Sequence, residues 1–128
     1  MKIFVCEHDP YRAKLMHDIL SVYNYKIVTM QKRGDIFKEI QQQRPAVIVI
    51  NETFAKESGA EMIAHLRQDP KTAHIPVVFI SNTAPVEQQL NQYRFDMLTE
   101  IIQEPIKIKN LRHYIDRWTT FRSLYIKH

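Results

Sequence analysis

Five consecutive apolar residues, Ala46 to Ile50, limit the fold more than any other feature of the sequence. The run lies between Pro45 and the polar Asn51, so it has the length of a β-strand and is far too short to cross a bilayer. A strand that is apolar on both sides needs cover on both sides, which is the position of a central strand in a parallel sheet. The run therefore predicts an α/β domain with helices on both faces of its sheet.

The remaining sequence alternates strand-sized apolar runs with longer helical spacings, which is the pattern of parallel βαβ units. Four more strands are predicted, at residues 2–6, 26–30, 75–80 and 98–103. Helices are predicted after Asp9-Pro10, around Ile36 to Ile40, after Gly59, from Pro85 to Phe95 and from Lys107 onward. The 128 residues suffice for one domain. We place it at residues 1–118, with residues 119–128 extending the last helix.

The apolar runs and the charge exclude several classes of protein. No run approaches the roughly 20 residues of a membrane span, and the N-terminus does not resemble a secretory signal, so we expect a cytoplasmic protein. The net charge of +4 is uneven, because residues 107–128 carry six Lys/Arg and one Asp, which is +5 and leaves −1 for residues 1–106. Cys6 is the single cysteine and lies in an apolar strand, so we assign it no chemistry. Because Gly34 and Gly59 are the only glycines, no glycine-rich phosphate-binding motif is present.

Polar residues directly follow four of the predicted strands. Glu7, His8 and Asp9 follow the first strand, Asn51 the third, Ser81 the fourth and Glu104 the fifth. In an open parallel sheet, ligands bind at the carboxyl ends of the strands, near the point where the strand order reverses. These residues are therefore the candidates for a functional site.

At these positions the sequence resembles the receiver domain of response regulators in two-component signalling, of the chemotaxis-regulator type. The resemblance covers residues 1–118 and rests on the segments IFVCEHDP, RPAVIVINETFAKESG, LRQDPKTAHIPVVFIS and IIQEPI, which occur in the family's order. It implies a three-layer, doubly wound, flavodoxin-like fold. Its five parallel strands would have the order 2-1-3-4-5, with helices on both faces.

The resemblance also implies where the family's phosphorylation chemistry would lie, because receivers are phosphorylated on an aspartate with the help of Mg²⁺. The acidic metal-binding pair falls on Glu7 and His8, and the acceptor on Asn51. The hydroxyl that senses the phosphoryl group falls on Ser81, and the lysine on Glu104, followed by Pro105. The aromatic switch position falls on Ile101.

Three of these substitutions oppose aspartyl phosphorylation. The amide of Asn51 lacks the nucleophilic oxygen that a carboxylate offers. With Glu7 as the one carboxylate left among the expected ligands, we expect Mg²⁺ binding to be weak or lost. Glu104 reverses a charge that is worth about 4 kcal/mol per charge pair at about 4 Å and an effective dielectric near 20. We therefore expect a pseudo-receiver that lacks the phospho-acceptor, is not an enzyme and needs no cofactor.

The altered pocket leaves two further interpretations open. His8 and Glu104 exchange the family's charges, so one hypothesis is an ion pair between them that closes the pocket. Alternatively, the pocket is a switch that responds to a metal, an anion or another ligand, with Glu7 and His8 as weak metal candidates. A single histidine without further nitrogen or sulfur ligands is little support for a metal site.

The last predicted helix is the candidate surface for a partner. It mixes aromatic and basic residues, which is typical of interfaces: Arg112, Trp118, Phe121, Arg122 and Tyr125. By resemblance, signalling partners or a second copy of the chain would bind the face formed by the fourth helix, the fifth strand and the fifth helix. We expect no membrane contact. Nucleic-acid binding through the basic segment ranks lowest, because no DNA-reading motif accompanies it.

Overall fold

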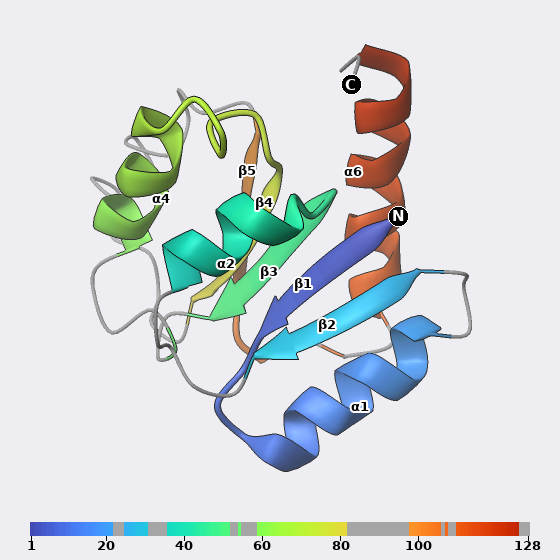
Figure 1. Cartoon of the computed structure of the whole chain (residues 1–128). Helices are drawn as coiled ribbons and strands as arrows, with labels where there is room; N and C mark the ends of the chain where they lie inside the picture. The colour runs from blue at the N-terminus through green and yellow to red at the C-terminus, as the bar shows by residue number, and fades with distance from the viewer. Residues whose placement is uncertain are drawn as a thin grey trace.

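The sheet of this computed structural model has five parallel strands. The structure describes residues 1–21, 25–30, 36–51, 54, 59–81, 98–105, 107 and 110–125, of which residues 59–63, 103 and 120–125 are described by their backbone alone. The strands are β1 (Lys2–Cys6), β2 (Lys26–Met30), β3 (Val47–Asn51), β4 (Val77–Ser81) and β5 (Thr99–Gln103). Their order is β2-β1-β3-β4-β5, with every neighbouring pair parallel (Figure 1). The predicted fold and strand order are confirmed.

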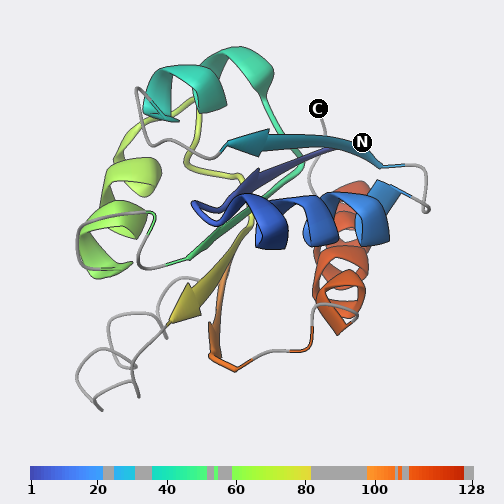
Figure 2. The same ribbon diagram turned by 90° about the horizontal axis from the view of Figure 1, so that it is seen from below.

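Helices cover both faces of this sheet (Figure 2). Those described are α1 (Pro10–Ser21), α2 (Ile36–Gln43), α4 (Gly59–Gln68) and α6 (Leu111–Tyr125). Helices α1 and α6 lie on one face, and α2 and α4 on the other. The helix predicted from Pro85 to Phe95 lies outside the described residues. None of the helices in the described part of the chain is long and apolar enough to cross a membrane.

The alternating directions of the strand side chains divide the core into two clusters. In β1, Ile3 and Val5 pack toward α1 and α6, while Phe4 and Cys6 pack toward α2 and α4. All five residues of β3 are buried, which confirms its position as a central strand. Burial also raises the pKa of the Cys6 thiol far above its ordinary value, so the thiolate is suppressed and the side chain is chemically inert.

Strands β3 and β4 extend one residue beyond their predicted ends. Asn51 pairs with Ile80, and Ser81 pairs with Gln103, so the parallel ladders continue through the first polar residue of each strand. Both polar residues are buried. The backbone hydrogen bonds of the ladder satisfy their N–H and C=O groups, so each strand continues although its apolar pattern has ended. Asn51 and Ser81 are therefore strand residues and not loop residues.

Arg67, at the end of α4, ties that helix to the starts of β4 and β5. One guanidinium nitrogen donates to the carbonyls of Ala73 and Ile75, and another donates to the carbonyl of Leu98 and the hydroxyl of Thr99, at 2.7–3.2 Å. Arginine suits this position because its fixed fork of donors reaches several acceptors at once. The edge strand β5 is therefore held at its amino end by a side chain from a helix.

Helix α6 is attached to the opposite edge of the sheet through Tyr25, which directly precedes β2. The Tyr25 hydroxyl donates to Asp116 and lies 3.4 Å from the hydroxyl of Thr119. Burial, followed by the hydrogen bond to Asp116, raises the pKa of Tyr25 above its ordinary value. The folded chain therefore favours the protonated phenol.

Replacing Tyr25 with phenylalanine is expected to lower the free energy of unfolding by about 1 kcal/mol at neutral pH, because the hydrogen bond is lost while water still reaches Asp116. The folded chain raises the pKa of Tyr25, so this stabilisation is present below about pH 10 and is lost as the pH rises through the raised value. Urea unfolding of both proteins at about pH 8 and about pH 11 tests this. A difference between the proteins that stays constant over this range would contradict it.

Candidate functional site

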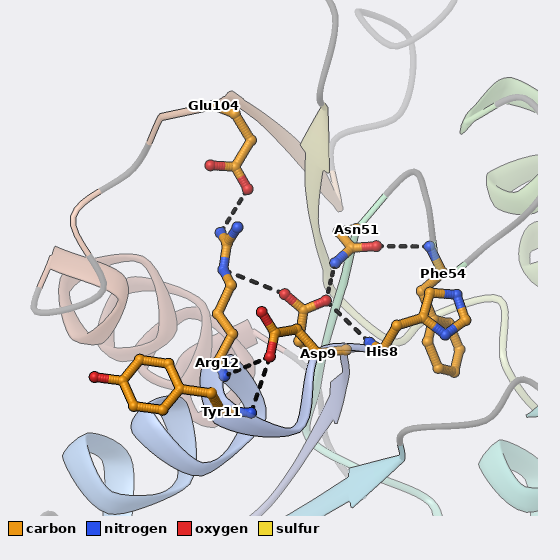
Figure 3. A network of polar contacts seen from close by, with 8 residues as sticks. His8, Asp9, Tyr11, Arg12, Asn51, Phe54 and Glu104 are labelled. Atoms are coloured by element: carbon orange, nitrogen blue, oxygen red, sulfur yellow. Dashed lines mark hydrogen bonds and ion pairs between the residues drawn. The ribbon is translucent and has the colours of Figure 1, made fainter.

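The predicted site residues meet where β1, β3 and β5 end (Figure 3). Glu7 follows β1, and its N–H donates to the carbonyl of Met30 at 3.0 Å. Asn51 is the last residue of β3. Glu104 follows β5, donates its N–H to the carbonyl of Ser81 at 2.8 Å and precedes a cis peptide bond to Pro105. The sheet itself therefore positions the three residues.

Helix α1 begins beside these strand ends because Asp9 caps it. The Asp9 carboxylate accepts hydrogen bonds from the N–H groups of Tyr11 at 2.9 Å and Arg12 at 3.4 Å, and its carbonyl accepts from Ala13 at 2.8 Å. This confirms the helix predicted after Asp9-Pro10, with Asp9 as its N-cap. The cap places Arg12 in the first turn of the helix, facing the ends of β1 and β5 (Figure 3).

The carboxylate of Glu7 is the centre of the site. Its side chain is only 4% exposed. One oxygen accepts hydrogen bonds from the His8 N–H at 3.0 Å and from the side-chain amide of Asn51. The other lies 3.2 Å from Nε of Arg12, which makes an ion pair without the alignment of a hydrogen bond. Both oxygens of this buried carboxylate are thus engaged by protein groups.

The orientation of the Asn51 amide follows from its neighbours. Its carbonyl oxygen accepts the N–H of Phe54 at 2.6 Å, so its NH₂ group is the part that faces Glu7. A carboxylate at this position could accept from Phe54 but could not donate to Glu7. The amide therefore suits this arrangement better than an acid.

Glu104 contacts Arg12, whose terminal nitrogen lies 2.5 Å from the Glu104 carboxylate. The hypothesis that Glu104 pairs with His8 assigned it the wrong partner. The His8 ring instead lies against Phe54, with ring centres 4.8 Å apart (Figure 3). The positive charge opposite the Glu104 carboxylate comes from Arg12, in the first turn of α1.

Arg12 is the site residue that the sequence analysis missed. It lies 92 positions before Glu104 in the sequence, and only the fold brings the two together. The available signal was its place three residues after the Asp9 cap, on the turn of α1 nearest the strand ends. The reversed charge at Glu104 indicated that a cation should be sought there.

The other predicted positions are part of the same sheet. Ser81 is buried at the end of β4, and half-buried Ile101 in β5 packs against the cluster under α2 and α4. Pro105 is exposed. A sensing role for Ser81 and a switch role for Ile101 stay predictions.

The residues present do not fit Mg²⁺, the ion that the family would place here. Mg²⁺ needs several oxygen ligands, usually carboxylates and water. Here Glu7 is already paired with the Arg12 guanidinium, and Asn51 turns N–H groups toward Glu7. Among the described residues, no three His, Cys, Asp or Glu side chains are grouped so as to hold a metal ion.

The predicted partner surface on α6 is described only in part. Trp118 is half-buried against its own domain, and its indole N–H donates to Glu100 at 2.8 Å. Arg112 is exposed and pairs with Asp116 at 3.1 Å. The side chains of Phe121, Arg122 and Tyr125 lie outside the described residues. An interface at these positions stays a prediction.

Comparisons with solved structures show the same fold along nearly the whole chain. A response regulator receiver domain protein from Clostridium thermocellum superposes with a TM-score of 0.80 at 12% identity, covering 98% of both chains. The receiver domain of a signal transduction histidine kinase from Syntrophus aciditrophicus gives a TM-score of 0.78 at 16% identity, covering 99% of this chain and 94% of that chain.

Two curated relatives are much longer than this chain. "Histidine kinase P4" of Formosa agariphila is 26% identical over 86% of this chain and 8% of its own length. The "3',5'-cyclic-nucleotide phosphodiesterase regA" of Dictyostelium discoideum is 23% identical over 98% of this chain and 16% of its own length. In both, the matching part is a small fraction of the protein.

The family model "Response regulator receiver domain" matches residues 3–116. With this match and the shared fold, the chain belongs to the family of response regulator receiver domains of two-component signalling.

Proposed function

We propose that this receiver domain acts in signal transduction through protein contacts, without phosphorylation of an aspartate. The observation that carries the proposal is Asn51 at the end of β3, where the family's acceptor is expected. Its amide is bonded to Phe54 on one side and to Glu7 on the other. An amide cannot form an acyl phosphate without losing its nitrogen, so this position offers no acceptor.

The charges around Asn51 also oppose a phosphoryl group. Such a group carries about −1.5 to −2 charge at neutral pH. It would lie near the carboxylates of Glu7 and Glu104, and the Arg12 guanidinium that faces them is already shared between the two. Repulsion in this partly buried site would act on bound phosphate as well as on a covalent phosphoryl group.

The partner we propose is another protein of two-component signalling or a second copy of the chain. Receiver sequences like this one occur in relatives named as histidine kinases, which supports a partner of that kind. We place the contact on β5, α6 and the segment before β5. Within the described part of that face, Arg112, His113 and Arg117 on α6 are exposed and would favour an acidic partner surface.

Intact-mass spectrometry after incubation with acetyl phosphate and Mg²⁺ tests this function. We expect no added phosphoryl mass on the wild-type chain, while a receiver with an intact aspartate, treated in parallel, gains one. A stable phosphoryl adduct on the wild-type chain would overturn the proposal. A phosphoryl group on a histidine would be distinguished from an acyl phosphate by its stability in alkali, which hydrolyses an acyl phosphate.

A further inference from the structure

We propose that Arg12 serves as a built-in cation, which takes the place of a bound divalent metal ion and closes the site to it. The inference rests on the proposed function in one respect, because it treats this pocket as the former phosphorylation site. It adds that the two acidic strand ends are held together by a charge attached to the chain itself.

The geometry of Arg12 carries this inference. Two nitrogens of one guanidinium contact two carboxylates, Glu7 at 3.2 Å and Glu104 at 2.5 Å. The carboxylates come from the ends of β1 and β5, and the arginine comes from the first turn of α1 (Figure 3). A single planar cation therefore bridges three elements of the fold.

The two carboxylates need a cation wherever it comes from. They have the same charge and contact the same group, and their side chains are only 4% and 21% exposed, so water screens their repulsion poorly. A bound divalent metal ion can neutralise such a pair, because carboxylates are its preferred ligands. Here the guanidinium, 27% exposed and always protonated, supplies the positive charge.

Arginine suits this task better than lysine would. Its planar group presents donors in fixed directions and is weakly hydrated, so it can contact two acids at once in a partly buried site. A lysine ammonium is a compact point charge that would favour one carboxylate or the other. The Asp9 cap also fixes the backbone of Arg12, which limits the directions its side chain can take.

This arrangement has a consequence for signalling. A metal-dependent receiver responds to the concentration of its ion, whereas a guanidinium on α1 is always present. The contact between α1 and the end of β5 therefore does not depend on Mg²⁺. Regulation would then come from a partner and not from a metal ion.

Mn²⁺ titration of four proteins tests the inference: wild type, Arg12→Met, Arg12→Lys and Arg112→Met as the control at an exposed ion pair. Removing the Arg12 charge leaves Glu7 and Glu104 facing each other, so Arg12→Met is expected to bind Mn²⁺ at least about tenfold more tightly than wild type. Its Tm should rise when Mn²⁺ is added. Wild type, Arg12→Lys and Arg112→Met should show no such rise.

NMR locates the effect, because Mn²⁺ broadens the signals of nearby residues. Broadening at Glu7, Asn51 and Glu104 is expected in Arg12→Met alone. Equal Mn²⁺ affinity in wild type and Arg12→Met, or Mn²⁺ binding at this site in Arg12→Lys, would overturn the inference. If Arg12→Met folds only when Mn²⁺ is present, that dependence supports the inference. If Arg12→Met misfolds with and without Mn²⁺, and Arg12→Lys binds Mn²⁺, the inference is contradicted.

The two proposals can fail separately. A phosphoryl adduct on the wild-type chain would contradict the proposed function and leave the Mn²⁺ result for Arg12→Met untouched. Equal Mn²⁺ binding in all four proteins, without an adduct, would contradict the role of Arg12 alone.

Discussion

Replacing Glu7 with alanine is expected to lower the free energy of unfolding by about 3–5 kcal/mol, because a buried ion pair would lose one partner. The Arg12 guanidinium would lose its more buried acid, and the Asn51 amide and the His8 N–H would lose their acceptor. Replacing Glu104 with alanine should cost only about 1 kcal/mol, because its carboxylate is more exposed and water can replace it beside Arg12. Urea unfolding at neutral pH measures both.

The comparison of these two variants is sharp because both acids contact the same guanidinium. Glu7→Gln provides a further control, since it keeps one oxygen acceptor and the side-chain volume while it removes the charge and turns the other oxygen into an NH₂ donor. Its loss of stability should lie between those of Glu7→Ala and Glu104→Ala. Equal losses for the two alanine variants would show that burial does not decide the strength of these contacts, and would contradict the description of Glu7 as the centre of the site.

Most of the fold could be predicted from the sequence, because each strand depends on a short pattern of its own. The apolar run from Ala46 to Ile50 indicates a central strand, and β3 is buried along its whole length. Leu111 and Ile115 share a helical face, and both are buried under α6. Such patterns follow from local periodicity and need no knowledge of distant residues.

The contacts within the site could be predicted only in part. The sequence places Glu7, Asn51 and Glu104 at strand ends on one edge of the site. In the structure, Arg12 contacts the two acids and Asn51 contacts Glu7. The pairing of Arg12 with Glu104 depends on the length and direction of the arginine side chain. The two residues lie 92 positions apart in the sequence. Local patterns contain no such information. The same holds for Arg67, whose four acceptors come from two segments, one before β4 and one at the start of β5.

The change Asn51→Asp is expected to destabilise the chain by about 2–3 kcal/mol at neutral pH, although it would restore the residue type that the family uses. The introduced carboxylate could still accept the N–H of Phe54. It could no longer donate to Glu7, and it would place a second negative charge beside that buried carboxylate. Mg²⁺ should not compensate, because the Arg12 guanidinium stays in place.

The loss of stability in Asn51→Asp should depend on pH. Repulsion and burial would raise the pKa of the introduced carboxyl group above its ordinary value of about 3.9. Its cost is therefore present above the raised pKa and disappears as the pH falls through it, since the protonated group can donate to Glu7 as the amide does. Urea unfolding at about pH 7 and about pH 5 measures the change.

Asn110→Asp, at an exposed position directly before α6, is the matched control and should stay within about 0.5 kcal/mol of wild type at both pH values. If Asn51→Asp were as stable as wild type at neutral pH, the amide would not be needed to balance Glu7, and a simple reversal could then rebuild the phosphorylation site. We expect instead that Arg12 and Asn51 must change together, because each compensates for the same buried carboxylate.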